Sequence, residues 1–187
     1  HLRFLMMAHG FSAILDATPA DRMYVVLPLY HTSGGICAIG STLSIGGSVV
    51  LRRKFSTQYF WEDCQRYGVT LVQHIGELCR YLLNAPAHPS EKAHSIRAMI
   101  GNGLRPEIWQ RFKNRFAIPL IIEFYRSTEG NVQLVNYDGT PGAVGRPGRS
   151  ASSSSSLSGV NVWPTIVWRS AVCALSGCTA TRFSPRA

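Results

Sequence analysis

Short apolar runs alternate with segments of helical spacing over the first 137 residues, and this alternation limits what the chain can fold into. Runs of strand length cover 24–29, 48–52, 70–73, 96–100, 120–124 and 132–135. Helical segments are expected over 2–15, 35–44, 56–68, 77–84 and from 106 onward. Strands that alternate with helices through short loops predict an α/β fold, with a mainly parallel sheet and flanking helices.

Local signals set the ends of two predicted helices. Ser56 is placed to cap the helix that contains Phe60 and Cys64, and Gly68 ends it. Pro106 suits the first turn of the next helix, because the N–H that proline lacks has no intrahelical partner there. The apolar stripe of that helix consists of Ile108, Phe112 and Phe116.

Polar loops follow three of the predicted strands, at 30–35, 101–105 and 125–130. Ligands of such sheets bind beyond the carboxyl ends of the strands. The last loop carries an aromatic ring (Tyr125), a hydroxyl (Thr128) and a carboxylate (Glu129). A ring can stack on a purine, a hydroxyl can donate to a phosphate oxygen, and carboxylate oxygen suits Mg²⁺. The pattern indicates a nucleotide–magnesium site; the alternative is a helix-capping threonine beside a solvated glutamate.

The net charge of +9, from 19 basic and 10 acidic residues, is typical of proteins that bind nucleic acid or anionic membranes. Residues 1–147 hold 15 basic residues and all 10 acidic ones, and these are interspersed. Nucleic-acid binding requires basic residues on one face with aromatic residues between them. A basic module that binds nucleic acid or a membrane is therefore the alternative function, and no nucleic-acid partner is expected.

Residues 148–187 depart from the pattern of the preceding chain. They contain ten serines among 40 positions, four arginines and no acidic residue. This composition predicts a disordered tail after a domain at 1–147. The abrupt loss of acidic residues supports a second hypothesis, a shift of reading frame near 145–148.

The five cysteines form no CxxC pair and no regular framework, so we expect reduced, mostly buried thiols in a cytoplasmic protein. No secretory signal pattern opens the chain. The uncharged stretch 23–51 is long enough to cross a bilayer. A membrane span there is the alternative to the predicted strand, loop, helix and strand.

Four tracts carry a resemblance to a known family. They are Leu27–His31 (LPLYH), Val69–Asn84 (with QHIGE), Gly101–Pro106 (GNGLRP) and Glu123–Gly130 (EFYRSTEG). Together they resemble the very-long-chain acyl-CoA synthetase and fatty acid transport protein branch of the adenylate-forming, or AMP-binding, superfamily. The resemblance covers 1–147 and implies part of the large N-terminal domain of such an enzyme.

The resemblance implies a two-step ligase that uses ATP, Mg²⁺ and coenzyme A. A long-chain or very-long-chain fatty carboxylate attacks the α-phosphate of ATP to form an acyl-adenylate, and the coenzyme A thiol then displaces AMP. The same-chemistry alternative is another carboxylate-adenylating ligase, acting on aryl or amino acids. The parent protein is expected to be cytoplasmic, with peripheral membrane association as the alternative.

For the nucleotide, the resemblance assigns Tyr125 to stacking on adenine, Thr128 to the phosphate and Glu129 to Mg²⁺. Arg126 stands where many relatives carry a small residue, often glycine. The tract that matches the adenine-lining loop consists of Gly101, Asn102 and Gly103; glycines there would let the backbone approach the ring.

For the acyl substrate, the resemblance places His31 near the carboxylate, and Gly76 and Glu77 in the wall of the acyl pocket. The predicted catalytic residues are His31, Thr128 and Glu129. A structural, hydrogen-bonded histidine is the alternative for His31. His74, Glu77 and Arg80 are as compatible with a buried polar cluster, or with a solvated helix face, as with a substrate contact.

The family's lysine-containing phosphate loop, its ribose-binding segment and its small C-terminal domain with a catalytic lysine have no match in the sequence. The lysines present are Lys54, Lys92 and Lys113, and none has that context. We therefore expect an internal fragment of a longer ligase, inactive by itself. A translated remnant without a function of its own is a further alternative.

Overall fold

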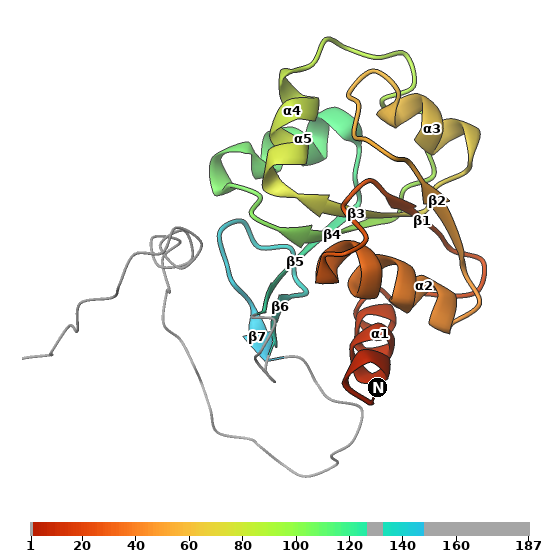
Figure 1. Cartoon of the computed structure of the whole chain (residues 1–187). Coiled ribbons are helices and arrows are strands. Elements are labelled where there is room, and N and C mark those ends of the chain that lie inside the picture. The colour runs from red at the N-terminus through yellow and green to blue at the C-terminus, as the bar shows by residue number, and fades with distance from the viewer. Residues whose placement is uncertain (1, 127–132, 148–187) are drawn as a thin grey trace, which may run out of the picture. The chain divides into compact units, whose positions relative to one another are not determined.

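One sheet with the strand order β2-β1-β3-β4-β5-β6-β7 organises the chain (Figure 1). The computed structural model describes residues 2–126 and 133–147. The strands are β1 (Arg22–Val25), β2 (Ser48–Leu51), β3 (Leu71–Ile75), β4 (Ala98–Asn102), β5 (Leu120–Arg126), β6 (Gln133–Asn136) and β7 (Arg146–Pro147). Strands β1 to β5 pair with their neighbours in parallel. Strand β6 pairs antiparallel with β5, and β7 pairs antiparallel with β6. The predicted mainly parallel sheet is confirmed.

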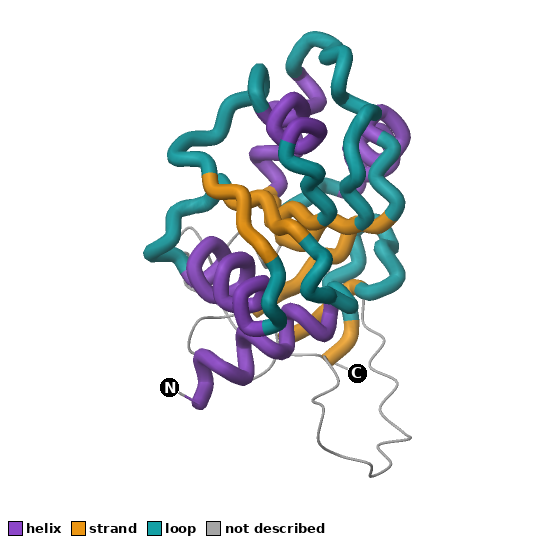
Figure 2. The backbone as a smooth tube through the Cα atoms, turned by 90° about the vertical axis from the view of Figure 1, so that its right-hand side faces the viewer, coloured by secondary structure: helices purple, strands orange, loops and turns teal. Residues whose placement is uncertain are grey.

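Helices cover both faces of this sheet (Figure 1, Figure 2). One face carries α3 (Phe60–Arg66), α4 (Gly76–Asn84) and α5 (Pro106–Phe116). The other carries α1 (Leu2–Ile14), the π-helix η1 (Ser33–Gly40) and α2 (Ser41–Ser44), which continues it. Successive strand side chains point to opposite faces, so Val72 belongs to the core beneath α3–α5 and Leu71 to the core beneath α1 and η1.

Helix α5 follows the sequence signals closely. Pro106 occupies its first turn, and Phe112 and Phe116 are buried. Ile108 is partly buried and packs against the same core, while Trp109, outside the predicted stripe, is almost fully buried. The apolar stripe is therefore wider than predicted, because the helix lies against both the sheet and the neighbouring helices.

The predicted cap at Ser56 is wrong. Helix α3 begins at Phe60 with no side-chain cap, and the backbone carbonyl of Ser56 accepts the Phe60 N–H instead. Residues 56–59 therefore form a turn before the helix begins. The predicted end of the helix holds, since Gly68 follows α3 with a positive φ of 58°.

Several predicted strand boundaries are also wrong, and β5 extends to Arg126, so Tyr125 lies in a strand rather than in the predicted loop. β1 covers Arg22–Val25 rather than 24–29, because the chain turns at Pro28, whose carbonyl accepts the His31 N–H. β4 covers Ala98–Asn102 rather than 96–100, since β3 offers ladder partners as far as Ile75. Gly101 and Asn102 therefore end a strand rather than begin a loop.

The stretch 23–51 consists of β1, a loop, the η1–α2 helix and β2. The alternative of a membrane span is therefore wrong for this stretch, and the predicted helix at 35–44 begins two residues earlier than expected, at Ser33. None of the helices in 2–126 and 133–147 has the length and apolarity needed to cross a bilayer.

The three described cysteines, Cys37, Cys64 and Cys79, are free and buried, as predicted. Burial raises the pKa of the Cys37 thiol to about 12 and also raises the pKa values of the other two. These thiols are protonated near neutral pH and are therefore poor nucleophiles. Cys173, Cys178 and the whole predicted tail at 148–187 lie outside the described residues.

Candidate functional site

The carboxyl ends of β3, β4 and β5 meet at one edge of the sheet. His74 pairs in register with Gly101, and Gly101 pairs with Glu123. Beyond this row, β3 leads directly into α4 at Gly76, and β4 leads into a short loop that reaches Leu104. Because the three strands are parallel and adjacent, their ends bring Gly76, Gly103 and Glu123 together although they are distant in sequence.

The peptide unit that joins Gly103 to Leu104 is packed against Gly76. A Cβ atom on Gly76 would overlap the Gly103 carbonyl group and lie 3.0 Å from the Leu104 nitrogen. Gly103 itself has a φ of +84°, a conformation that glycine adopts without strain. Gly76 is therefore required by the close approach of the two backbone segments, and Gly103 is required by its backbone conformation.

The same peptide unit is held from its other side by Glu123. The Leu104 N–H donates to Oε1 of Glu123 over a donor–acceptor distance of 2.6 Å, and the Glu123 side chain is almost entirely buried. Burial raises the pKa of Glu123 to about 7, although the hydrogen bond from Leu104 favours the ionised form. The Glu123 carboxyl group, which holds the Gly103–Leu104 peptide unit, therefore titrates near neutral pH.

His74 lies on the α4 side of the sheet, where Gly101 makes room for it. A Cβ atom on Gly101 would lie 2.8 Å from the Cγ atom of His74. The His74 side chain is fully buried, its Nδ1 lies 3.6 Å from Sγ of Cys79, and its Nε2 has no hydrogen-bond partner among the described residues. Burial lowers the pKa of His74 to about 4, so the ring is neutral near pH 7.

His74, Glu77 and Arg80 do not form one buried polar cluster, which was one of the alternatives for them. His74 is in the core, whereas Glu77 is exposed on α4 and pairs with Arg80 at 2.7 Å. The hydrogen bond from Arg80 lowers the pKa of Glu77. Glu77 and Arg80 therefore lie on an exposed face of α4, and Glu77 is not among the residues that line the pocket described next.

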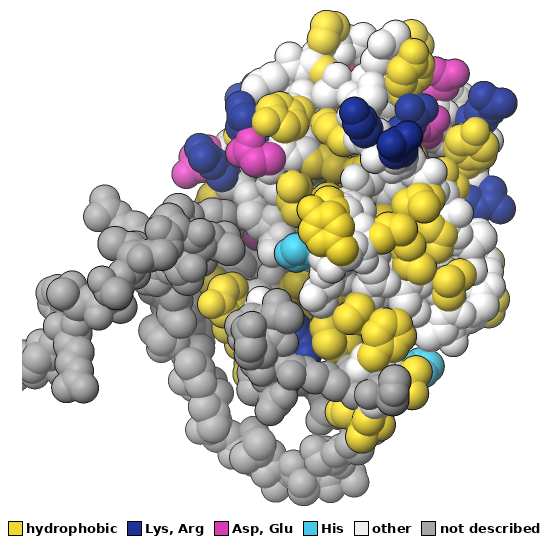
Figure 3. Space-filling model, viewed as in Figure 1, with side chains coloured by type: hydrophobic (Ala, Val, Ile, Leu, Met, Phe, Trp, Pro, Cys, Tyr) yellow, Lys and Arg dark blue, Asp and Glu magenta, His cyan; other side chains and the backbone are white. Residues whose placement is uncertain are grey.

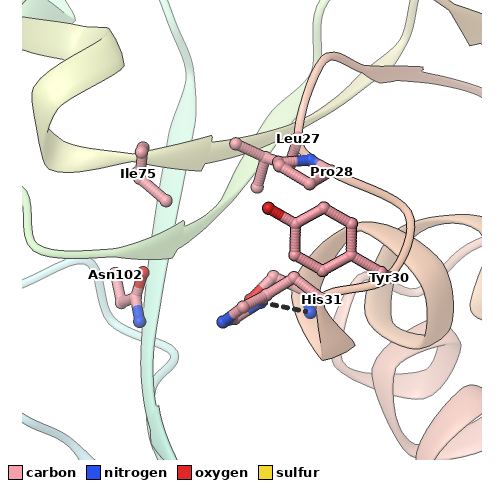
Figure 4. A pocket seen from close by; sticks show the side chains of 7 residues that line it. Leu27, Pro28, Tyr30, His31, Ile75 and Asn102 are labelled. Carbon is pink, nitrogen blue, oxygen red and sulfur yellow. Dashed lines mark hydrogen bonds between the residues drawn. The ribbon is translucent and has the colours of Figure 1, made fainter.

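A pocket of about 250 Å³ lies at the same edge of the sheet, on the face that carries η1 (Figure 4). It is lined by Leu27, Pro28, Tyr30, His31, Ser33, Ile75 and Asn102. Figure 4 shows Tyr30 and His31 on one side and Ile75 and Asn102, from the ends of β3 and β4, on the other. The walls are mainly apolar, with a few polar side chains, as in sites that bind small organic molecules.

His31 is oriented by its own loop. Its Nδ1 accepts the Ser33 N–H at 3.2 Å, and its backbone N–H donates to the Pro28 carbonyl at 3.1 Å. A neutral ring that accepts at Nδ1 carries its proton on Nε2. The ring therefore presents an N–H donor from the loop, on the side of the pocket that faces Asn102 (Figure 4).

Tyr125 and Asn102 point to opposite faces of the sheet. Tyr125 shares the alternation of Glu123 and lies on the α5 side, where its ring is 46% exposed. Asn102 lies on the η1 side with His31. The sequence reasoning grouped Asn102 with Gly101 and Gly103, but the structure puts its side chain in the pocket with His31.

Thr128 and Glu129, and with them the predicted phosphate and magnesium contacts, lie outside the described residues. Within 2–126 and 133–147, no group of three or more His, Cys, Asp or Glu side chains is arranged to hold a metal ion. The described part of the site therefore consists of three features. They are the Gly103–Leu104 peptide unit held by Gly76 and Glu123, the exposed Tyr125 ring, and the pocket beside His31.

The sequence analysis did not assign a role to Glu123, Tyr30 or Ile75. A signal for Glu123 was available, since it is a single acidic residue inside the apolar run of β5. Tyr30 and Ile75 carried no such signal, because a surface tyrosine and a strand isoleucine are ordinary. Their place in the pocket depends on which strands are neighbours.

The charged surface does not favour the basic binding module. Ion pairs with acidic residues engage Arg52, Arg80, Arg97, Arg115 and Arg146. On the face shown in Figure 3, several Lys and Arg side chains lie beside acidic ones, and hydrophobic side chains surround a histidine near the middle.

Comparison with known proteins matches the chain to one enzyme family and to relatives within it. The family model for AMP-binding enzymes matches residues 1–153. The chain is 48% identical to human long-chain fatty acid transport protein 3 over 146 residues, which is 78% of this chain and 21% of that protein. It is 50% identical to mouse long-chain fatty acid transport protein 1 over 145 residues, or 78% of this chain and 22% of that protein.

Solved structures share the fold. ATP-bound MatB from Rhodopseudomonas palustris superposes with a TM-score of 0.68 at 26% identity, over 76% of this chain and 29% of that chain. A putative long-chain-fatty-acid CoA ligase from the same organism gives 0.66 over 77% of this chain and 36% of that chain; at 23% identity this likeness concerns the fold alone. The chain spans about a fifth of the length of the curated relatives it matches. From the family model, the relatives and the shared N-terminal-domain fold, this chain belongs to the AMP-binding enzyme family.

Proposed function

We propose that the chain forms the adenine- and carboxylate-facing part of a fatty acid–CoA ligase for long-chain or very-long-chain fatty acids. The observation that supports this most is the fixed Gly103–Leu104 peptide unit at the carboxyl end of β4, next to the exposed Tyr125 ring of β5. A flat backbone edge on one side and an aromatic ring on the other suit a purine.

The adenine of ATP would lie between Tyr125 and the Gly101–Gly103 tract. Without a side chain at position 103, the backbone at the end of this tract can approach the base closely and offer it carbonyl and N–H groups. Tyr125 would stack on the other face of the base, which favours any adenine nucleotide. The described residues thus fit the adenine moiety of the cofactor.

The fatty carboxylate would enter the pocket beside His31. The Nε2–H of His31 is a suitable donor to a carboxylate oxygen, and Leu27, Pro28 and Ile75 provide apolar walls for the adjoining methylene groups. These walls favour an acyl substrate over an amino acid, whose ammonium group would need an acidic partner there. His31 would then hold and orient the carboxylate as it approaches the α-phosphate.

In the proposed reaction, a carboxylate oxygen bonds to the α-phosphorus as the bond to pyrophosphate breaks. The sulfur of coenzyme A then bonds to the acyl carbon, AMP leaves with the bonding electrons, and the thiol proton passes to solvent. Mg²⁺ would neutralise charge on the phosphates, and Glu129, with Thr128 at the phosphate, is the proposed residue for holding it.

Replacing Tyr125 with alanine should weaken binding of an adenine nucleotide about tenfold, because stacking on an aromatic ring contributes roughly 1–3 kcal/mol. The measurement is titration of the 187-residue chain with adenosine, followed by amide chemical shifts. Tyr67→Ala is the matched control, since Tyr67 is similarly exposed but follows α3.

Equal affinity of the Tyr125→Ala variant and the native chain would contradict the stacking role. Salt-sensitive binding to DNA or to acidic vesicles, with no response to adenosine, would instead support the basic binding module. Formation of acyl-CoA by the chain from ATP, fatty acid and coenzyme A would contradict the expectation that it is inactive by itself.

A further inference from the structure

A single peptide unit supports the proposed adenine contact, and Glu123 is the titratable group that holds it. On one side the Gly103 carbonyl is packed against Gly76, and on the other the Leu104 N–H donates to Glu123. Leu104 is fully buried, so this N–H has no access to water as a substitute acceptor. A carboxylate oxygen is a stronger acceptor than the oxygen of a neutral carboxyl group, so the protonation state of Glu123 influences how firmly the turn is held.

We propose that Glu123 is a proton-sensitive positioning residue for the nucleotide loop: when ionised it holds the Gly103–Leu104 peptide in the conformation that binds adenine, and when protonated it holds this peptide less tightly. The inference rests on the proposed function, since it concerns adenine at the same loop. It goes beyond that function in making nucleotide affinity depend on pH through a residue that does not contact the nucleotide.

Among the described residues that face Glu123, it is the one whose charge changes near neutral pH. From α4, the Cys79 thiol faces it and is kept protonated by burial. From β3, His74 lies across Gly101 and is neutral above about pH 4. From β6, Asn136 is its register partner and carries no charge. At the start of α5, Arg105 is exposed and acts electrostatically on Glu77.

Two effects oppose each other at this carboxyl group. Burial favours the protonated form and raises the pKa of Glu123 to about 7, whereas the Leu104 N–H favours the ionised form. A ligand that binds only when the ionised carboxylate holds the Gly103–Leu104 peptide further favours the ionised form of Glu123. By linkage, adenine binding should lower the pKa of Glu123 and release a proton, and adenine affinity should fall as the pH drops below about 7.

The test uses the 187-residue chain and adenosine, which has no phosphate group to titrate in this range. Adenosine affinity and the Leu104 amide resonance are followed between about pH 5.5 and pH 8.5. We expect affinity about tenfold weaker at the acid end and a Leu104 amide shift with its midpoint near pH 7. Binding measured by calorimetry in two buffers of different ionisation enthalpy should show proton release.

Glu123→Gln should abolish the pH dependence of both readouts, because the amide accepts the Leu104 N–H but does not ionise. Glu62→Gln is the matched control, since Glu62 is exposed on α3 and should leave both curves unchanged. If Glu123→Gln does not fold, the proton release and the Leu104 amide titration of the native chain still decide the matter.

The outcomes separate this inference from the proposed function. Adenosine binding that is constant with pH, without proton release, would overturn the role of Glu123 and leave the proposed function intact. No adenosine binding at any pH would overturn the proposed function, and with it the role of Glu123.

Discussion

Replacing Gly76 with alanine is expected to destabilise the chain by about 3 kcal/mol and to abolish adenosine binding. The new methyl group would overlap the Gly103 carbonyl group, which is backbone and has no rotamer that would relieve the contact. Either α4 or the Gly103–Leu104 peptide must move, and Glu123 holds that peptide in place. Urea unfolding and adenosine titration measure the two effects separately.

Gly10→Ala is the matched control for this substitution. Gly10 lies inside α1, and a Cβ atom there would have no neighbour within 4 Å. Alanine favours a helix over glycine by roughly 1 kcal/mol, so this variant should be as stable as the native chain or more so. An unchanged urea midpoint in Gly76→Ala would show that the close approach between α4 and the loop is not required.

Replacing Asp21 with alanine is expected to cost about 3 kcal/mol of the free energy of unfolding. Asp21 is almost fully buried and accepts hydrogen bonds from Arg97, from the Thr18 backbone and from the Thr70 hydroxyl. These bonds tie the turn before β1 to the chain that enters β3 and β4. Without the carboxylate, the Arg97 guanidinium would lose its ionic partner and keep only the backbone carbonyls of Leu15 and Asp16 as acceptors.

The Asp21 carboxylate should also make the free energy of unfolding depend on pH in acid. The hydrogen bond from Arg97 holds the pKa of Asp21 well below its ordinary value of about 3.9. A depressed pKa in the folded state means that the contribution to stability is complete above the ordinary value and is lost as the pH falls below it. Stability should therefore decrease between about pH 4 and pH 2, and this decrease should be smaller in Asp21→Asn.

Asp138→Ala provides the control, because Asp138 pairs with Arg146 at an exposed position. Both of these side chains are mostly exposed, and such ion pairs contribute roughly 0–1 kcal/mol. Unfolding curves at neutral pH should separate Asp21→Ala from the native chain and leave Asp138→Ala close to it. Equal effects of the two substitutions would contradict the structural role of Asp21.

The sequence predicted the type and order of most elements because its patterns are local. Period and length identified α5 and the strands, and alternation of the two predicted a parallel sheet between helices. Boundaries were less accurate where a neighbouring strand decided them. Gly101 and Asn102 have low strand propensity, yet they extend β4 because His74 and Ile75 of β3 offer hydrogen-bond partners.

The candidate site was predicted in part for the same reason. The tracts that hold Gly101, Tyr125 and His31 were identified from residue types. The structure places Gly101 and Tyr125 near the carboxyl ends of adjacent strands, and His31 in the pocket beside the ends of β3 and β4. The alternation of side chains along β4 and β5 then separates Asn102 from Tyr125 onto opposite faces. The roles of Thr128 and Glu129 remain predictions.

The sequence alone determined the α/β fold and the burial of the described cysteines, and it predicted the tracts in which ligand chemistry would reside. Only the tertiary structure decided that Gly76 and Glu123, which are distant in sequence, hold one peptide unit between them. The physical reason is that local patterns fix what each segment becomes, whereas burial, and with it the raised pKa of Glu123, arises only when segments pack.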